Sequence, residues 1–294
     1  MNIPNHPGEI MPKVVQNHLT KRLDTITAPL LHETDFAIEK TFGSNSDWSE
    51  VKIYDSITDI IARLSSRIFL GPELCRDHDW LNISKQFTIS MLTNMMILRP
   101  FPVWLRPLVY WLSPICFKFR ALYWKASQLV DSIVTERRRI QKECVAAGRQ
   151  PPVYNDALEW VDKESAGMPV VVADFQLSMS VSAVHTTSDL FSQTMLQLAA
   201  HPKVVDALRK EMLEVLPVHG FKKSGFASLK LLDSAIKEAQ RIKPLMSANM
   251  QRLVLKDTVL EGGVLLLKGE VVAVDAGSKL WDPEKYPDPE KFDP

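Results

Sequence analysis

The sequence predicts a mainly α-helical protein with a small β element near its C-terminal end. Three observations lead to this prediction. Apolar residues recur at helical spacing through the first two thirds of the chain. The segment Val170–Ala200 carries only two charged residues, Asp174 and Asp189, which indicates a long helix buried on most sides. After Pro244 the pattern changes to Val- and Leu-rich runs separated by glycine-containing pairs, which is typical of short strands and turns.

Composition limits the class of protein. The chain has 294 residues, of which 46% are hydrophobic and 24% charged, as expected of a folded chain with one large or two ordinary domains. Lys and Arg total 35 and Asp and Glu total 35, so the basic excess of a nucleic-acid-binding protein is missing. Cys75, Cys116 and Cys144 lie far apart and form no CxxC pair, which argues against a disulfide framework or structural zinc and favours a reducing compartment.

The sequence shows no segment that predicts secretion or membrane spanning. Met1–Glu9 is polar and contains two prolines, unlike a secretory signal peptide. Met91–Phe119 is apolar and aromatic, but prolines and arginines interrupt it. This second segment therefore argues against a spanning helix and leaves two alternatives, a membrane-surface segment or ordinary core and loop.

Apolar periodicity predicts four helices in the N-terminal half of the chain. Their ranges are Met11–Lys40, Ser49–Phe69, Asp77–Leu98 and about Ile115–Ala147. Pro29 should kink or divide the first helix. Residues 100–114 are expected to be a proline-rich connector. Arg137-Arg138-Arg139 is predicted to be a solvated end of the fourth helix, favoured by the helix dipole.

Four further helices and a small sheet are predicted in the C-terminal half. The helices are Asn155–Lys163, Val170–Ala200, Val204–Leu216 and Leu229–Ile242. Strands are expected within Gln251–Leu255 and Val264–Val274, next to turns at Gly262-Gly263 and Lys268-Gly269. Trp281–Pro294 is a Pro-, Asp- and Lys-rich meander.

The common phosphate-binding and hydrolase motifs are missing, so the candidate chemistry lies on helices. The segment Ser182–Asp189 places polar side chains in the most apolar helix of the chain. Threonines in such a place can hydrogen-bond one turn back and loosen the helix, which suits a helix that admits a ligand or water. The alternative is a helix face turned to solvent, or a buried histidine whose hydrogen bonds are satisfied.

A second signal is the pair Glu238 and Arg241, which share one helix face and can form an ion pair. Taken alone, such a pair is usually solvated and contributes little. The order of elements is more specific than either motif. The interrupted helix is followed by another helix, then by the helix of this pair, a β hairpin and the meander of residues 281–294.

In these residues and their order, the chain resembles the cytochrome P450 monooxygenases, especially fungal members that oxidise terpenoid-like secondary metabolites. Ser182–Thr187 is similar to the oxygen-binding motif [AG]-G-x-[DE]-T-[TS] of that family. Glu238–Arg241 matches its ExxR motif, and Phe292–Pro294 matches the start of the segment that completes it. The resemblance implies a mainly α, partial P450 fold and a single incomplete P450 domain over residues 1–294.

The resemblance also implies roles for these residues. Thr186 would support proton delivery, with Thr187 beside it. His185 stands where the family usually has an acid, and an imidazole there can still relay protons or bind a substrate. Glu238 and Arg241 would brace the core on the haem side.

A further set of residues would contact the cofactor and the substrate. Arg252 is expected to pair with a haem propionate. Ala183 is expected to lie beside the cofactor, at a position where the family usually has glycine. Val184, Leu245 and Met246 are expected to line an apolar substrate pocket.

Two hypotheses follow from the resemblance. In the first, the chain belongs to a haem-dependent monooxygenase that receives electrons from an NADPH–P450 reductase and oxidises a lipophilic small molecule, with no role for nucleic acid. The axial cysteine thiolate of the family would lie beyond Pro294. In the second, the chain is a catalytically inactive P450 relic or an incomplete gene model that binds at most a ligand or a membrane. The family location is the cytosolic face of the endoplasmic reticulum membrane, whereas a chain without an anchor would be cytosolic.

Overall fold

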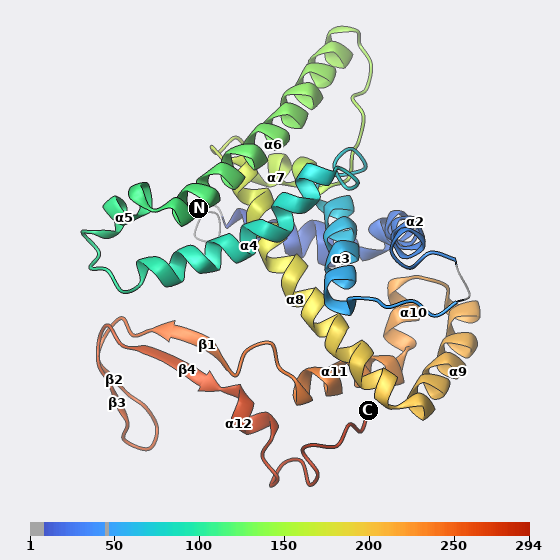
Figure 1. The fold of residues 1–294 in the computed structure, drawn as a ribbon. Coiled ribbons are helices and arrows are strands. Elements are labelled where there is room, and N and C mark those ends of the chain that lie inside the picture. The colour runs from blue at the N-terminus through green and yellow to red at the C-terminus, as the bar shows by residue number, and fades with distance from the viewer. Residues whose placement is uncertain (1–8, 45–46) are drawn as a thin grey trace. The chain divides into compact units, whose positions relative to one another are not determined.

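The computed structural model describes residues 9–44 and 47–294, and Figure 1 shows the order of their helices and strands. Most of the polar segment Met1–Glu9 lies outside the described residues. The chain forms two compact units, one comprising residues 1–188 and 221–223 and the other residues 189–220 and 224–294. No helix in the described part of the chain has the length and apolar character needed to cross a membrane.

The first unit is helical. Its elements are α1 (Ile10–Val14), the π-helical turn η2 (Val15–Thr20), α2 (Leu23–Phe42), α3 (Ile53–Phe69), α4 (His78–Leu98), α5 (Arg106–Leu112), α6 (Pro114–Ala146), α7 (Ala157–Ser165) and the first part of α8 (Val172–Ala200). Helix α2 packs on α3, α4 on α6, and α1 on α7. Their common core contains the fully buried rings of Trp80, Phe87, Trp160 and Phe175.

The first predicted helix is divided, but not at Pro29. Lys21 and Arg22 separate η2 from α2, and Pro29 lies inside the continuous helix α2. A proline in a helix removes one hydrogen bond, to the residue four positions earlier, here Thr25, and its ring crowds the carbonyl group of that residue. Because Thr25 lies in the first turn of α2, most of the helix keeps its hydrogen bonds. Of the two expected effects of Pro29, a kink or a division, the division was therefore wrong.

Side-chain caps fix the start of two predicted helices. Oδ1 of Asp77 accepts a hydrogen bond from the main-chain N–H of Trp80 (2.7 Å) at the start of α4. Oδ1 of Asp156 accepts one from the N–H of Glu159 (3.1 Å) at the start of α7. Helix α5 was not predicted and lies within the connector of residues 100–114, with Pro107 in its first turn, where proline is tolerated.

Helix α8 is buried almost all round in its first part and on one face only farther along. Residues 173 and 175–180 are all buried in the core of the first unit. Farther along the helix, Phe191, Met195 and Leu196 are exposed by 45%, 41% and 52%. The apolar composition of the segment therefore predicts the helix correctly but overestimates how much of its surface is covered.

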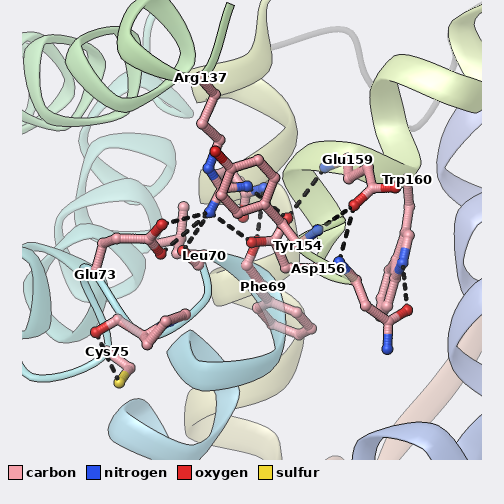
Figure 2. A network of polar contacts seen from close by, with 12 residues as sticks. Phe69, Leu70, Glu73, Cys75, Arg137, Tyr154, Asp156, Glu159 and Trp160 are labelled. Carbon is pink, nitrogen blue, oxygen red and sulfur yellow. Dashed lines mark hydrogen bonds and ion pairs between the residues drawn. The ribbon is translucent and has the colours of Figure 1, made fainter. Parts of the chain in front are cut away.

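Arg137 of α6 is a buried connection between three segments and not a solvated helix end. Its guanidinium donates hydrogen bonds to Asp156 (2.9 and 2.7 Å), to Glu73 (3.1 and 3.2 Å) and to the main-chain oxygen of Leu70 (3.4 Å). The ring of Tyr154 lies over the guanidinium at 3.8 Å (Figure 2). Although burial alone lowers it, the bonds and charges of Asp156 and Glu73 raise the pKa of Arg137.

The second unit combines helices with two small sheets. Its remaining elements are α9 (Pro202–His219), α10 (Lys223–Ser228), α11 (Lys230–Ile242), β1 (Ala248–Leu253), β2 (Thr258–Val259), β3 (Leu265–Leu266), β4 (Val271–Asp275) and α12 (Ala276–Leu280). Strands β1 and β4 pair antiparallel, with Leu253 opposite Val271, and β2 pairs with β3 around Gly262-Gly263. The core of this unit includes Leu208, Ala239 and Phe292.

Candidate active site

The polar segment of α8 is a continuous helix whose hydroxyl groups bond to its own main chain. Ser182 Oγ donates to the oxygen of Ser178 (2.9 Å), Thr186 Oγ1 to that of Ser182 (2.7 Å) and Ser188 Oγ to that of Val184 (2.7 Å). Each hydroxyl proton is therefore used inside the helix. The hydroxyl oxygens keep lone pairs and can accept a further hydrogen bond.

Thr186 and Thr187 are exposed on this segment, whereas Val184 and Ser188 are buried. The Ala183 side chain is half-buried. The Thr187 hydroxyl has no hydrogen-bond partner among the described residues. The two threonines can thus contact a ligand directly, whereas Val184, expected in the substrate pocket, is packed inside the first unit at 1% exposure.

His185 is held by two other helices of the first unit. Its Nε2 lies 2.9 Å from the main-chain oxygen of Lys85 on α4, and its Nδ1 lies 3.4 Å from the Tyr54 hydroxyl on α3. The Lys85 ammonium in turn forms an ion pair with Asp59 of α3. The imidazole of His185 is therefore oriented by its surroundings.

Glu238 and Arg241 form a two-pronged ion pair on α11. Arg241 Nε and Nη2 lie 2.8 Å from the two carboxylate oxygens of Glu238. The Arg241 side chain is only 7% exposed and the Glu238 side chain 14%, so this is not a solvated surface pair. The hydrogen bond from Arg241 lowers the pKa of Glu238, and the same bond raises the pKa of Arg241.

The pair also holds the meander in place. Arg241 donates to the main-chain oxygens of Leu280 (3.0 Å), Pro289 (2.8 Å) and Lys291 (3.1 Å). The main-chain N–H of Asp293 donates to Glu238 Oε1 at 3.1 Å. Hydrogen bonds from one guanidinium to three carbonyl groups fix the course of an otherwise irregular segment.

Arg252, Leu245 and Met246 lie at the surface of the second unit. The Arg252 guanidinium donates only to the main-chain oxygen of Gln251 (2.8 Å) among the described residues, and no carboxylate neutralises it. This guanidinium can therefore form an ion pair with a bound anion. Leu245 and Met246, in the loop between α11 and β1, are exposed by 50% and 54%.

The three cysteines of the chain lie in different surroundings. Burial, followed by the nearby charge of Glu33, raises the pKa of Cys75, which keeps this thiol protonated. Cys116 is fully buried, and Cys144 is half-buried near the end of α6. No cluster of three His, Cys, Asp or Glu side chains suited to a metal occurs among residues 9–44 and 47–294.

Two residues of the site were missed by the sequence analysis. Tyr54 and Lys85 contact His185 from positions 131 and 100 residues away in the chain. No local pattern marks either residue, because Tyr54 lies in the first turn of a long amphipathic helix and Lys85 contributes its main-chain oxygen. Only the packing of α3 and α4 against α8 brings them to the imidazole.

Comparison with known proteins identifies the family. The family model described as Cytochrome P450 matches residues 13–294. The chain is 37% identical over 287 residues to the cytochrome P450 monooxygenase adrA of Penicillium rubens, with 98% of this chain and 56% of that protein covered. It is 35% identical over 287 residues to the dihydromonacolin L monooxygenase mokC of Monascus pilosus, with 98% and 55% covered.

Solved structures agree on the fold. The retinoic acid-bound cyanobacterial CYP120A1 superposes with a TM-score of 0.71 at 18% identity, covering 98% of this chain and 60% of that one. A zebrafish cytochrome P450 with abiraterone gives a TM-score of 0.71 at 17% identity, covering 97% and 64%. The chain thus spans little more than half the length of the curated relatives described above. Because the family model matches almost the whole of this chain, the chain belongs to the cytochrome P450 family.

Proposed function

We propose that the chain is part of a haem-dependent monooxygenase that inserts one atom of dioxygen into a lipophilic small molecule. The observation that carries the proposal is the exposed Thr186 hydroxyl on the polar segment of α8, beside the oriented His185. The buried Glu238–Arg241 pair and the segment it holds support the same function, because they match the family motif residue by residue.

The residues fit part of the surroundings of a haem. Exposed Thr186 and Thr187, with the small side chain of Ala183 beside them, leave room for a flat ring against α8. Arg252 has no carboxylate partner, which suits a haem propionate. In this proposal, none of Cys75, Cys116 and Cys144 would supply the cysteine ligand of the haem. When bound, the haem supplies the activation of dioxygen.

Each of these residues has a defined task in this proposal. Thr186 accepts a hydrogen bond at its hydroxyl oxygen and keeps a proton donor close to the reacting centre. His185 keeps its proton at Nε2, which donates to the Lys85 carbonyl group, and can take up a second proton at Nδ1. Glu238 and Arg241 fix the main chain of residues 280–293, and Arg252 orients the cofactor.

The proposed substrate is an apolar, terpenoid-like secondary metabolite. Exposed Leu245 and Met246 offer apolar contact area without charge, which suits a lipophilic molecule. The curated relatives include a protein named for dihydromonacolin L, a small molecule, which is consistent with this class of substrate.

We also propose contact with a membrane surface, at the cytosolic face of the endoplasmic reticulum, and electron supply by an NADPH–P450 reductase. Around α5, Met96, Trp104, Trp111 and Leu112 are exposed by 74%, 77%, 67% and 72%. Arg99 and Arg106 lie beside them in the sequence. Exposed tryptophans flanked by arginines are typical of a segment that lies in the membrane interface.

The full-length protein that contains this chain tests the proposal. It should bind haem, and its reduced form should give an absorption band near 450 nm under carbon monoxide. With reductase and NADPH, it should add one oxygen atom to a terpenoid-like substrate. Haem binding without any oxidised product across a panel of such substrates would favour the inactive alternative, and failure to bind haem would contradict both the cofactor and the activity.

A further inference from the structure

The two ring nitrogens of His185 have chemically different partners. Nε2 lies 2.9 Å from the main-chain oxygen of Lys85, and a carbonyl oxygen can only accept a hydrogen bond. The proton of the neutral imidazole is therefore on Nε2. Nδ1 is then the basic nitrogen, and it faces the Tyr54 hydroxyl at 3.4 Å.

Tyr54 connects this nitrogen to solvent. Its side chain is 42% exposed, and it lies in the first turn of α3, where the Thr58 hydroxyl bonds to its main-chain oxygen at 2.7 Å. The Lys85 ammonium of α4 forms an ion pair with Asp59 of α3. The tyrosine hydroxyl is the solvent-accessible group in contact with Nδ1.

We infer that Tyr54 is a positioning residue for His185, holding the imidazole in one tautomer and linking its basic nitrogen to water. This inference rests on the proposed function, in which His185 takes part in proton delivery. Tyr54 donates to Nδ1 of the neutral ring. When the ring is charged, the Tyr54 proton has moved to Nδ1 and the tyrosine oxygen has taken one proton from solvent.

The contacts of the ring are compatible with both charge states. Nε2–H donates to Lys85 in each case, and the bond between Nδ1 and Tyr54 only reverses its direction. The ring can thus gain or lose a proton without a rotation about its side-chain bonds. A carboxylate at this position could not hold the Lys85 carbonyl group in this way, because both groups accept hydrogen bonds.

The test is the Tyr54→Phe variant of the full-length holoenzyme, which removes one oxygen atom from a partly exposed ring. Nitrogen NMR of histidine-labelled protein reports the tautomer, with the His185 signals assigned by their loss in His185→Gln. In the variant, the Nδ1 resonance should move toward that of a nitrogen without a hydrogen bond, while Nε2 stays protonated. An unchanged Nδ1 resonance would overturn the inference.

Turnover supplies the second measurement. Product formed per NADPH should fall by about two- to tenfold, the size of one lost hydrogen bond, whereas KM for the substrate should stay the same. Unchanged coupling despite a shifted Nδ1 resonance would contradict the link to proton delivery. Tyr154→Phe is the matched control, because the Tyr154 hydroxyl has no hydrogen-bond partner among the described residues. If the unmodified protein forms no product, the proposed function fails, and the NMR measurement still decides the contact between Tyr54 and His185.

Discussion

The main-chain N–H of Asp293 donates a hydrogen bond to Glu238 Oε1 at 3.1 Å, across 55 positions of the sequence. The same carboxylate oxygen accepts from Arg241 Nη2 at 2.8 Å. Glu238 therefore links helix α11 both to its own arginine and to the end of the meander. This arrangement makes the pair a structural centre of the second unit.

Removing Arg241 should destabilise that unit strongly. Arg241→Ala leaves the Glu238 carboxylate buried without its partner and frees three main-chain carbonyl groups, at an expected cost of about 3–5 kcal/mol in unfolding free energy. Arg241→Lys should be nearly as harmful, because an ammonium group cannot make the planar set of bonds. Urea unfolding of the full-length protein measures both changes.

Lys237→Ala is the control for these variants. Lys237 pairs with Asp233 on the same helix, but the two side chains are 72% and 58% exposed. Its loss should change the unfolding free energy by less than about 1 kcal/mol. Equal changes in unfolding free energy for Arg241→Ala and Lys237→Ala would show that burial does not determine how much the Glu238–Arg241 pair stabilises the protein.

Acid should weaken the second unit through Glu238. The hydrogen bond from Arg241 lowers its pKa in the folded protein, so its contribution is complete above the ordinary glutamate pKa of about 4.3 and disappears as the pH falls through the lowered value. Glu238→Gln should therefore be less stable than the unmodified protein at pH 7, and the difference should shrink in acid. A difference that is constant between pH 7 and pH 3 would contradict this assignment.

Thr186→Ala should separate NADPH consumption from product formation. The side chain is exposed, so the variant should fold with a stability change within about 0.5 kcal/mol. Product per NADPH should fall because the hydroxyl oxygen is lost, and the ratio of product to peroxide measures this change. Thr194→Ala removes an equivalent back-bonded hydroxyl from α8, which donates to Leu190 at 2.8 Å, and should leave the ratio unaltered.

Two glycine variants should distinguish backbone strain from crowding of the Arg137 network. Gly71 and Gly148 have φ of +77° and +66°, so alanine at either position should cost about 1–2 kcal/mol in unfolding free energy. Only at Gly71 would the new Cβ meet side chains, 2.7 Å from Oδ2 of Asp156 and 2.7 Å from Oε2 of Glu73. Gly71→Ala should therefore lower the melting temperature more than Gly148→Ala, and equal shifts would exclude a contribution from crowding.

Alkylation should distinguish the three thiols. Cys144 is half-buried, whereas Cys75 and Cys116 are exposed by 1% and 0% and the pKa of Cys75 is raised by burial. Iodoacetamide at neutral pH should modify Cys144 first in the folded protein, because the thiolate is the reactive form. Mass spectrometry of the digested protein identifies the site, and rapid modification of Cys75 would contradict its described environment.

Local signals predicted much of this fold. The caps Asp77 and Asp156 adjoin the helices they start, and the spacing of Glu238 and Arg241 already places both on one face. Connections between distant segments could not be predicted in this way. Arg137 resembles its exposed neighbours in the sequence, and only folding brings Glu73, 64 positions away, to its guanidinium.

Two errors have the same local cause. Prolines were taken as helix breakers, but Pro29 lies within α2 and Pro107 in the first turn of α5. Pro107 occupies a position whose N–H would have no partner within the helix, so the missing donor there has little effect. Pro29 lies in the second turn of α2 and removes one hydrogen bond, to Thr25. The position of a proline relative to the helix start, which the sequence does not mark clearly, decides its effect.

Arg241 hydrogen-bonds to residues 280–291 through three main-chain oxygens, and its guanidinium also lies over the Tyr286 ring, 4.7 Å from the ring centroid. Every amino acid carries such an oxygen, so the side chains of Leu280, Pro289 and Lys291 can change without removing an acceptor. Side chains at these three positions can thus be exchanged while the course of the segment is preserved. A single arginine on a helix can in this way hold a loop largely independently of the side chains at its acceptor positions.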